Sequence, residues 1–165
     1  MGADCFRWQG IQAIMKILIV TPFFPYAKVP HAGGRFIYDL VHCLSQKHMV
    51  YLLSRIAPDE VQFSTEMMDL CHDVNLYQFR NPVKRNLFCL LRIALSYVIL
   101  GLKANRIVRK GDFDLVQVEF VETGLMIKTK RSVPMILNAH DIPSVPWKRR
   151  YLKTGGWGRL TNYLF

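Results

Sequence analysis

The sequence predicts an α/β fold, a Rossmann-like, mostly parallel sheet with helices on both faces. Apolar runs of strand length recur along the chain, and segments with helical spacing separate them, which is typical of parallel strands joined by helices. The first run, KILIVT at 16–21, is apolar without alternation, as in a strand buried on both faces. At 165 residues, 51% of them hydrophobic, the chain fits one domain with a hydrophobic core.

The elements between and after that first strand follow from spacing. Apolar residues recur at i, i+3, i+4 and i+7 from Ile37 to Leu44, which predicts a helix with one core face that runs to about Gln46. Residues 58–73 carry several acids and no lysine or arginine, and we expect them to form a solvated helix. Further helices are expected at 83–110 and 122–130, and strands at 16–21, 49–56, 74–79, 113–120 and 133–141.

The domain is expected to occupy residues 15–165, after a leader at 1–14 that is not part of the fold. The last segment, GWGRLTNYLF, has the pattern of a helix start and stops on apolar residues without a C-cap. We therefore expect the domain to be incomplete at its C-terminal end. The chain shows no secretory signal pattern, and the expected location is cytoplasmic.

The cysteines indicate no metal site. They are widely spaced, contain no C-x-x-C pair and have no histidine at zinc-ligand spacing. The interpretation is reduced, buried thiols in a cytoplasmic protein, with metal and disulfide roles as the alternatives. The cysteines are Cys5, Cys43, Cys71 and Cys89.

The formal net charge of +10 favours an anionic partner. Between Arg80 and Lys110 there are eight lysines and arginines and no acid. At 100° per residue some of these cations form a narrow stripe, and Phe88 and Ile99 point into nearly the same sector. Cations beside apolar groups suit an anionic membrane surface, and a merely solvated basic face is the alternative. The candidate membrane-binding residues are Arg85, Arg92, Lys103 and Lys110.

Two further segments bear on the partner of this basic region. The apolar segment 86–102 is slightly short for a membrane span and is interrupted by Arg92, so we expect a buried or interfacial helix. A second basic cluster, WKRRYLK at 147–153, contains Trp147 and Tyr151. No helix-turn-helix, zinc-finger or RNP-type pattern accompanies the charge, which argues against nucleic acid as the partner.

Candidate site residues follow three expected strands at their carboxyl ends, where open parallel sheets bind ligands. Gly33-Gly34 lies in the loop after the first strand. The pair predicts either a tight turn with positive φ or a backbone that admits a phosphate to a helix N-terminus; no G-x-G-x-x-G or Walker pattern is present. Glu119 is either a solvated strand end or an acceptor-site carboxylate. His140 either bonds nearby backbone or donates to a sugar hydroxyl or phosphate, and Asp141 could cap the next helix.

The order of these features resembles a known family. The segments MKILIVTPFFPYAKVPHAGGRFIYDLVHCLSQKHMVYLLS, FDLVQVEF and VPMILNAHDIPSVPWKRRY resemble the N-terminal domain of glycosyltransferase family 4 enzymes, over roughly residues 15–165. The resemblance implies the N-terminal half of a GT-B fold. It also implies a retaining transferase that moves a sugar from a nucleotide-sugar donor to a glycan or lipid-linked acceptor, without a metal or a further cofactor.

The resemblance assigns roles only at matching positions. Gly33 and Gly34 match the loop that approaches the donor diphosphate, and His140 matches the strand-end histidine near the transferred sugar. Glu119 lies near the position where the family often places an acceptor-side polar residue. The N-terminal domain of the family usually holds the acceptor, and a basic, apolar-studded helix such as 83–110 often accompanies lipid-linked acceptors at the inner face of the membrane.

The sequence departs from the family in lacking the second domain and its E-x7-E motif. Because a ligand cleft needs two walls, we expect little or no transferase activity from this chain alone, whether it is a fragment, a truncated frame or a subunit of a split enzyme. The missing domain or subunit is then its expected partner. The alternatives are a non-catalytic basic, peripheral membrane-binding Rossmann-like module, and another small-molecule binder in which the glycines only form a turn.

Overall fold

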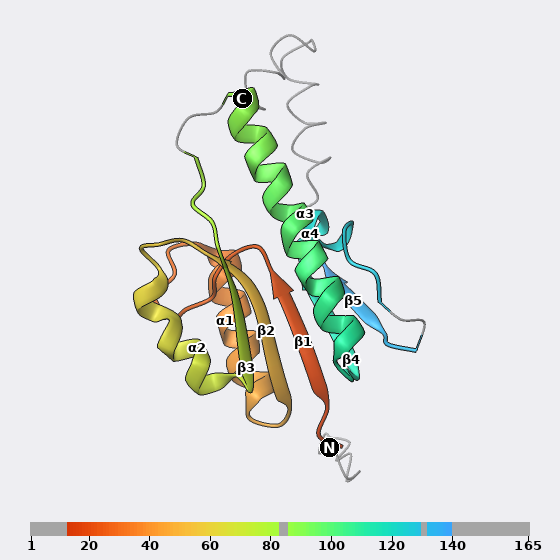
Figure 1. Cartoon of the computed structure of the whole chain (residues 1–165). Helices are drawn as coiled ribbons and strands as arrows, with labels where there is room; N and C mark the ends of the chain where they lie inside the picture. Colours follow the sequence, from red (N-terminus) through yellow and green to blue (C-terminus); the bar gives the residue numbers. More distant parts are fainter. Residues whose placement is uncertain (1–12, 83–85, 130–131, 140–165) are drawn as a thin grey trace, which may run out of the picture.

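A computed structural model describes residues 13–82, 86–129 and 132–139. These residues form a five-stranded sheet with the strand order β3-β2-β1-β4-β5, in which every pairing is parallel (Figure 1). The chain therefore has the predicted α/β, Rossmann-like fold. The strands are β1 Lys16–Thr21, β2 Met49–Ile56, β3 Asp73–Gln78, β4 Leu115–Glu119 and β5 Met135–Asn138.

Helices cover both faces of this sheet, as expected (Figure 1). Ile37 and Val41 of α1 pack in one core cluster with Met67 of α2, while Leu100 and Ala104 of α3 pack in a second cluster. Each fully buried aliphatic side chain stabilises the fold by roughly 1.5–3 kcal/mol. The helical elements are α1 Ala32–Ser45, the 3₁₀ turn η1 Val61–Phe63, α2 Ser64–Leu70, α3 Leu87–Lys110 and α4 Val121–Gly124.

The central strand β1 separates the two core clusters. Ile17 and Ile19 belong to the cluster under α1, and Leu18 and Val20 belong to the cluster under α3. All four side chains are fully buried, which explains why the run is apolar without alternation. Because β1 pairs in parallel with both β2 and β4, the carboxyl ends of these strands lie at one edge of the sheet (Figure 1).

The expected solvated helix at 58–73 is wrong in two respects. The segment forms η1 followed by the shorter helix α2, and Met67 of α2 is fully buried in the core. The helix expected at 122–130 is also shorter, because α4 ends at Gly124. The acids of this segment indicated a solvent-exposed helix. One apolar side chain per turn is nevertheless enough to attach a short helix to the sheet.

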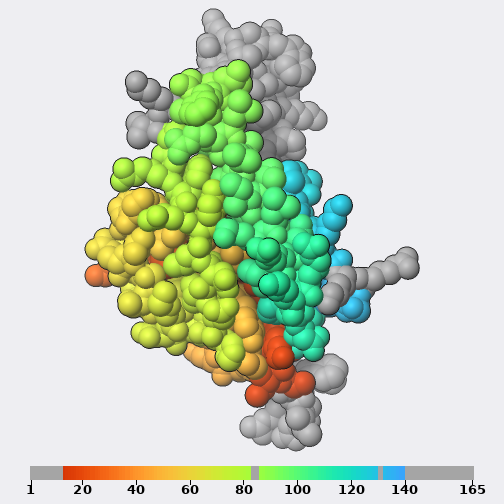
Figure 2. Space-filling model, viewed as in Figure 1, coloured from red at the N-terminus to blue at the C-terminus, as the bar shows by residue number. Residues whose placement is uncertain are grey.

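Helix α3 is buried over only part of its length. Its C-terminal half packs on the sheet, while its N-terminal half extends past the carboxyl edge of the strands (Figures 1 and 2). By length and composition α3 is able to cross a membrane; its most apolar window has a mean hydropathy of 1.9 and is 22% buried. The helix is therefore buried along one side, with most of its buried residues in the C-terminal half and Cys89 and Ser96 in the N-terminal half. Exposed apolar side chains on α3 are Leu87, Phe88, Leu91, Leu95 and Leu102.

Candidate functional site at the carboxyl edge of the sheet

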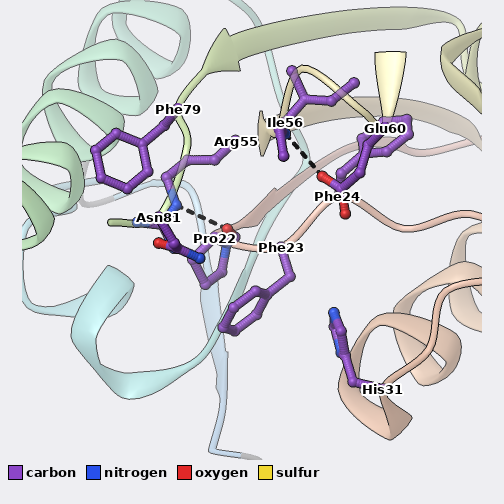
Figure 3. A pocket seen from close by; sticks show the side chains of 10 residues that line it. Pro22, Phe23, Phe24, His31, Arg55, Ile56, Glu60, Phe79 and Asn81 are labelled. Atoms are coloured by element: carbon purple, nitrogen blue, oxygen red, sulfur yellow. Dashed lines mark hydrogen bonds between the residues drawn. The ribbon is translucent and has the colours of Figure 1, made fainter. Parts of the chain in front are cut away.

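A pocket of about 200 Å³ opens where the first three strands end (Figure 3). Its walls come from the loop after β1, the residue before α1, the end of β2 and the segment after β3. This is the edge at which open parallel sheets bind ligands. The side chains that matter below are Phe23, His31, Arg55, Glu60, Phe79 and Asn81.

Arg55 places a buried positive charge in the wall of this pocket. The residue is 4% exposed, its Nε donates to the Pro22 carbonyl at 2.8 Å, and its Nη1 donates to Ser96 Oγ at 2.6 Å. The guanidinium carbon lies 4.5 Å from the centre of the Tyr97 ring and 5.2 Å from that of Phe79. Burial lowers the pKa of Arg55, and Tyr97 opposes that shift; a guanidinium starts so high that it stays protonated.

The charge of Arg55 has neutral partners. Between the described residues the structure shows one ion pair, Arg35 with Asp39 on the surface of α1, and no described carboxylate lies within ion-pair distance of Arg55. The acid in the pocket wall, Glu60, accepts a hydrogen bond from the Ala57 N–H at 2.8 Å. The pocket therefore contains a desolvated cation that the described part of the protein does not neutralise.

His31 caps α1 at the rim of the pocket. Its backbone is extended, its Nδ1 accepts from the Gly34 N–H at 2.9 Å, and its carbonyl accepts from the Arg35 N–H at 3.2 Å. An acceptor side chain at this position satisfies one of the amides that a helix start leaves without a partner.

The glycine pair lies inside the first turn of α1, and neither glycine has a left-handed φ. The interpretation as a tight turn with positive φ is therefore wrong. A Cβ on Gly34 would lie 2.6 Å from His31 Cε1 and 2.8 Å from Val29 Cγ2, so the cap and its packing require a glycine there. The role of Gly33 and Gly34 beside a donor diphosphate stays a prediction.

Gly33 connects the start of α1 to the end of β4. A Cβ on Gly33 would lie 3.0 Å from Cζ of Phe120, the residue that directly follows β4 and has a φ of 70°. The Phe120 ring packs edge-on against Phe23 at 4.9 Å, and Phe23 packs against His31 at 5.1 Å. The start of α1 therefore lies beside the end of β4, and aromatic rings make the contact.

Glu119 is completely buried at the end of β4, so it is not a solvated strand end. Its Oε1 accepts a hydrogen bond from Gln117 Nε2 at 2.7 Å. A carboxylate held there, next to Phe120, is compatible with an acceptor-side role, which stays a prediction. His140 and Asp141 lie outside the described residues.

The predicted basic stripe lies on α3. Arg92, Lys103 and Lys110 are exposed, while Arg85 lies outside the described residues. Lys103 Nζ lies 5.8 Å from the centre of the Tyr77 ring, and Arg92 lines a hollow of about 220 Å³ with Arg80, between the end of β3 and α3. The hollow with Arg92 therefore adjoins the Arg55 pocket: Phe79 lines both, and Ser96 in its wall accepts a hydrogen bond from Arg55.

Sequence reasoning missed Arg55 and His31. Arg55 had a signal, because it is the one charged residue in the apolar run MVYLLSRI. His31 stands directly before Ala32 and the glycine pair, at the position where a helix start needs an acceptor. Neither residue can be recognised as part of a site until the structure places the end of β2 and the start of α1 at the same edge of the sheet.

Thiols and acids form no metal centre in the part of the chain that the structure describes, where no three histidines, cysteines or acids are grouped. Cys71 and Cys89 are buried, as expected, whereas Cys43 is exposed on α1, and Cys5 lies outside the described residues. Burial, with a further contribution from Asp73, raises the pKa of Cys71 to about 12.

Comparisons with known proteins identify the fold only. No protein-family model and no curated protein matches the sequence. The C-terminal domain of PF1911 hydrogenase from Pyrococcus furiosus is similar with a TM-score of 0.54 at 16% identity, over 75% of this chain and 91% of that chain. CalG4, the calicheamicin glycosyltransferase, is similar with a TM-score of 0.50 at 15% identity, over 87% of this chain and 38% of that chain. The chain thus spans well under half of the glycosyltransferase with which it shares its fold.

Proposed function

We propose that this domain forms the acceptor side of a retaining, family-4-like glycosyltransferase that uses a nucleotide-sugar donor. The observation that carries the proposal is the meeting of the α1 N-terminus with the end of β4, where Phe120 packs against Phe23 and stands over Gly33. This meeting occurs at the carboxyl edge of a sheet whose fold is shared with part of a glycosyltransferase.

The start of α1 supplies donors suited to a diphosphate. The amides of Gly34 and Arg35 are engaged by His31, which leaves the amides of Ala32 and Gly33 as the first N–H groups of the helix, without acceptors in the helix itself. The helix dipole adds to their attraction for an anion. In sugar transfer, negative charge develops on the leaving diphosphate, and fixed N–H donors stabilise it.

The catalytic roles in this proposal belong to His140 and Glu119. His140 acts near the transferred sugar, and Glu119 acts on the acceptor side as a buried carboxylate. The donor is the nucleotide sugar itself, with no metal or further cofactor.

Transfer by this domain requires a second wall. The pocket at the carboxyl edge is open and small, and ligand sites bury most of the ligand surface. A second domain or a partner subunit would close the cleft and hold most of the nucleotide. The domain alone is then expected to bind a nucleotide sugar weakly and to transfer no sugar.

Ala32→Pro tests the diphosphate site. Proline at the first helical position removes one N–H and suits helix geometry, and the extended backbone of His31 suits a residue before proline. We expect saturation-transfer NMR to detect UDP or GDP sugars on the wild type, and Ala32→Pro to weaken that binding about tenfold, the effect of one hydrogen bond to a charged group.

Leu87→Pro is the matched control, because it removes the first amide of α3, whose cap Asn86 is also extended. It should leave nucleotide-sugar binding unchanged. Equal binding by wild type and Ala32→Pro, or no signal from any nucleotide sugar on the wild type, would contradict the proposed function.

A second candidate function is peripheral binding to an anionic membrane surface, at the inner face of the membrane. Four apolar side chains in the first turns of α3 are 56–69% exposed, and the basic stripe with Arg92 runs beside them. Apolar side chains at the lipid boundary with cations at the phosphate level suit such a surface. The four are Leu87, Phe88, Leu91 and Leu95.

Vesicle co-sedimentation tests this candidate. Vesicles with phosphatidylglycerol should retain the protein, and Arg92→Glu should reduce binding about tenfold or more, since each basic residue near an anionic surface contributes about 1 kcal/mol. Lys47→Glu, at the far end of α1, makes the same change of charge away from α3 and should have little effect. Equal losses in the two variants would show that only net charge matters.

A further inference from the structure

The buried guanidinium of Arg55 is the least explained group at the carboxyl edge. A charge taken out of water is costly unless a partner of opposite charge or a set of hydrogen bonds compensates it. Here the compensation comes from a carbonyl, a hydroxyl and aromatic faces, and no described acid pairs with the cation. Such an arrangement keeps the cation in place and leaves its charge available.

The guanidinium also retains free donors. Of its five N–H groups, the Pro22 carbonyl and Ser96 Oγ accept one each. The other N–H groups belong to a side chain in the wall of the pocket (Figure 3). A planar fork of donors in a site of low dielectric suits the oxygens of a phosphate or a carboxylate.

Other polar side chains of the pocket wall suit the hydroxyl groups of a sugar that carries the oxyanion. Glu60 accepts from the Ala57 N–H through one oxygen and has further acceptor capacity for hydroxyl groups. Asn81 adds an amide with both donors and acceptors on the exposed side of the pocket. The wall thus combines one cation with polar groups that hydrogen-bond sugar hydroxyls.

The pocket adjoins the proposed donor position at His31, the cap of α1, but Arg55 lies away from that position (Figure 3). Phe23 stands between them: Arg55 Cζ lies 5.9 Å from its ring centre, and the Phe120 ring over Gly33 contacts the same ring at 4.9 Å. An anion beside Arg55 and a diphosphate at the start of α1 would therefore occupy different places at this edge.

We infer that the Arg55 pocket binds an oxyanion group, a phosphate or a carboxylate, carried by the sugar acceptor. The assignment of this group to the sugar acceptor rests on the proposed function, while the oxyanion site itself rests on the pocket alone. It makes Arg55 a binding residue, in addition to its contacts that hold the loop after β1.

Titration with inorganic phosphate, and separately with acetate, tests the site and shows whether it binds a phosphate or a carboxylate. Binding is followed by chemical shifts in NMR spectra of the whole chain at constant ionic strength. The wild type should bind at least one of the two anions, and Arg55→Met should weaken that binding at least tenfold. Arg109→Met removes the same charge from an exposed position on α3, where Nε donates to the Asn105 carbonyl, and should bind like the wild type.

Arg55→Met could fail to fold because the side chain also has structural contacts, so a second pair of variants is needed. Asn81→Asp adds a carboxylate at the exposed side of the pocket and leaves Arg55 itself unchanged. It should weaken anion binding at least threefold. Gln46→Glu adds the same charge at the opposite end of α1 and should not. Equal binding by Asn81→Asp and Gln46→Glu, or no binding of either anion by the wild type, would overturn the oxyanion site.

A competition experiment separates this inference from the proposed function. Phosphate or acetate should bind with unchanged affinity when a nucleotide sugar is present. Displacement of the nucleotide sugar by the small anion in the wild type but not in Arg55→Met would overturn the assignment to the acceptor, because the pocket would then belong to the donor. Nucleotide-sugar binding without any anion binding would overturn the inference and leave the proposed function standing.

Discussion

The Nη1 of Arg55 donates to Ser96 Oγ at 2.6 Å and thereby joins the end of β2 to the middle of α3. The same guanidinium donates to the Pro22 carbonyl, so one buried side chain connects the first loop, the second strand and the longest described helix. Ser96 in turn donates to the Ile93 carbonyl at 2.6 Å. Because the N-terminal half of α3 extends beyond the sheet (Figure 1), the contact positions this projecting half relative to the pocket.

Ser96→Ala is expected to destabilise the protein by about 1–3 kcal/mol, because a buried donor of Arg55 loses its acceptor. Urea denaturation followed by circular dichroism measures the change in the free energy of unfolding. Ser45→Ala is the matched control, since Ser45 Oγ donates to the His42 carbonyl on the exposed side of α1 and should cost under about 0.5 kcal/mol. Equal losses would mean that the hydroxyl of Ser96 is dispensable to Arg55.

Gly34→Ala is expected to destabilise the protein by about 1–3 kcal/mol, although glycine-to-alanine changes in helices ordinarily stabilise. The new methyl group would meet His31 and Val29 closer than 3 Å, and the cap would have to move. Gly33→Ala should have a smaller effect, because its methyl group meets only the end of the Phe120 ring. The free energies of unfolding of both variants check this order; a stabilised Gly34→Ala would contradict it.

His31→Ala is expected to destabilise the protein by about 0.5–2 kcal/mol through loss of the helix cap. His31→Asn keeps an acceptor at the same position and should recover most of that loss. Thermal denaturation of the two variants in parallel makes the comparison. If asparagine is no better than alanine, the role of His31 lies in its ring contact with Phe23 and not in the hydrogen bond to Gly34.

Much of the fold was predictable from sequence because its central strands are buried on both faces. The expected bounds of β1 and β2 are those observed, since a continuous apolar run ends abruptly where the chain leaves the core. The segment 58–73 was predicted less well. Asp59 and Asp69 are exposed, but the burial of Met67 depends on where α2 meets the sheet, and helical spacing alone does not contain that information.

The candidate site was predictable only by position. The carboxyl-edge rule correctly brought Gly33 and the end of β4 together, yet Glu119 proved buried and Gly34 proved necessary for packing. Arg55 was missed because its burial depends on Phe79 and Tyr97, which follow it at distant positions in the sequence. The charge of an arginine can be read from a sequence, but its isolation from acids depends on tertiary contacts.

Cys71 is expected to be unreactive in the folded protein, because burial, assisted by Asp73, raises the pKa of its thiol to about 12. The thiolate is the nucleophile, so at pH 8 almost none is present. Alkylation with iodoacetamide, followed by mass spectrometry, should modify exposed Cys43 within minutes and Cys71 only after unfolding. Equal modification rates for the two cysteines without denaturant would contradict this prediction.

The same shift makes stability depend on pH in a defined window. The thiol titrates at about 12 in the folded state and near its ordinary pKa of 9.0 when unfolded, so the folded state holds the proton more tightly. Its contribution is fully present below pH 9 and is lost as the pH rises toward 12, with a slope of up to about 1.4 kcal/mol per pH unit. Urea denaturation of wild type and Cys71→Ala at pH 8, 9 and 10 isolates this slope, because the other titrating groups are common to both proteins. Cys43→Ala should follow the wild type, and a Cys71→Ala curve that falls as steeply as the wild type above pH 9 would show that Cys71 is not the source.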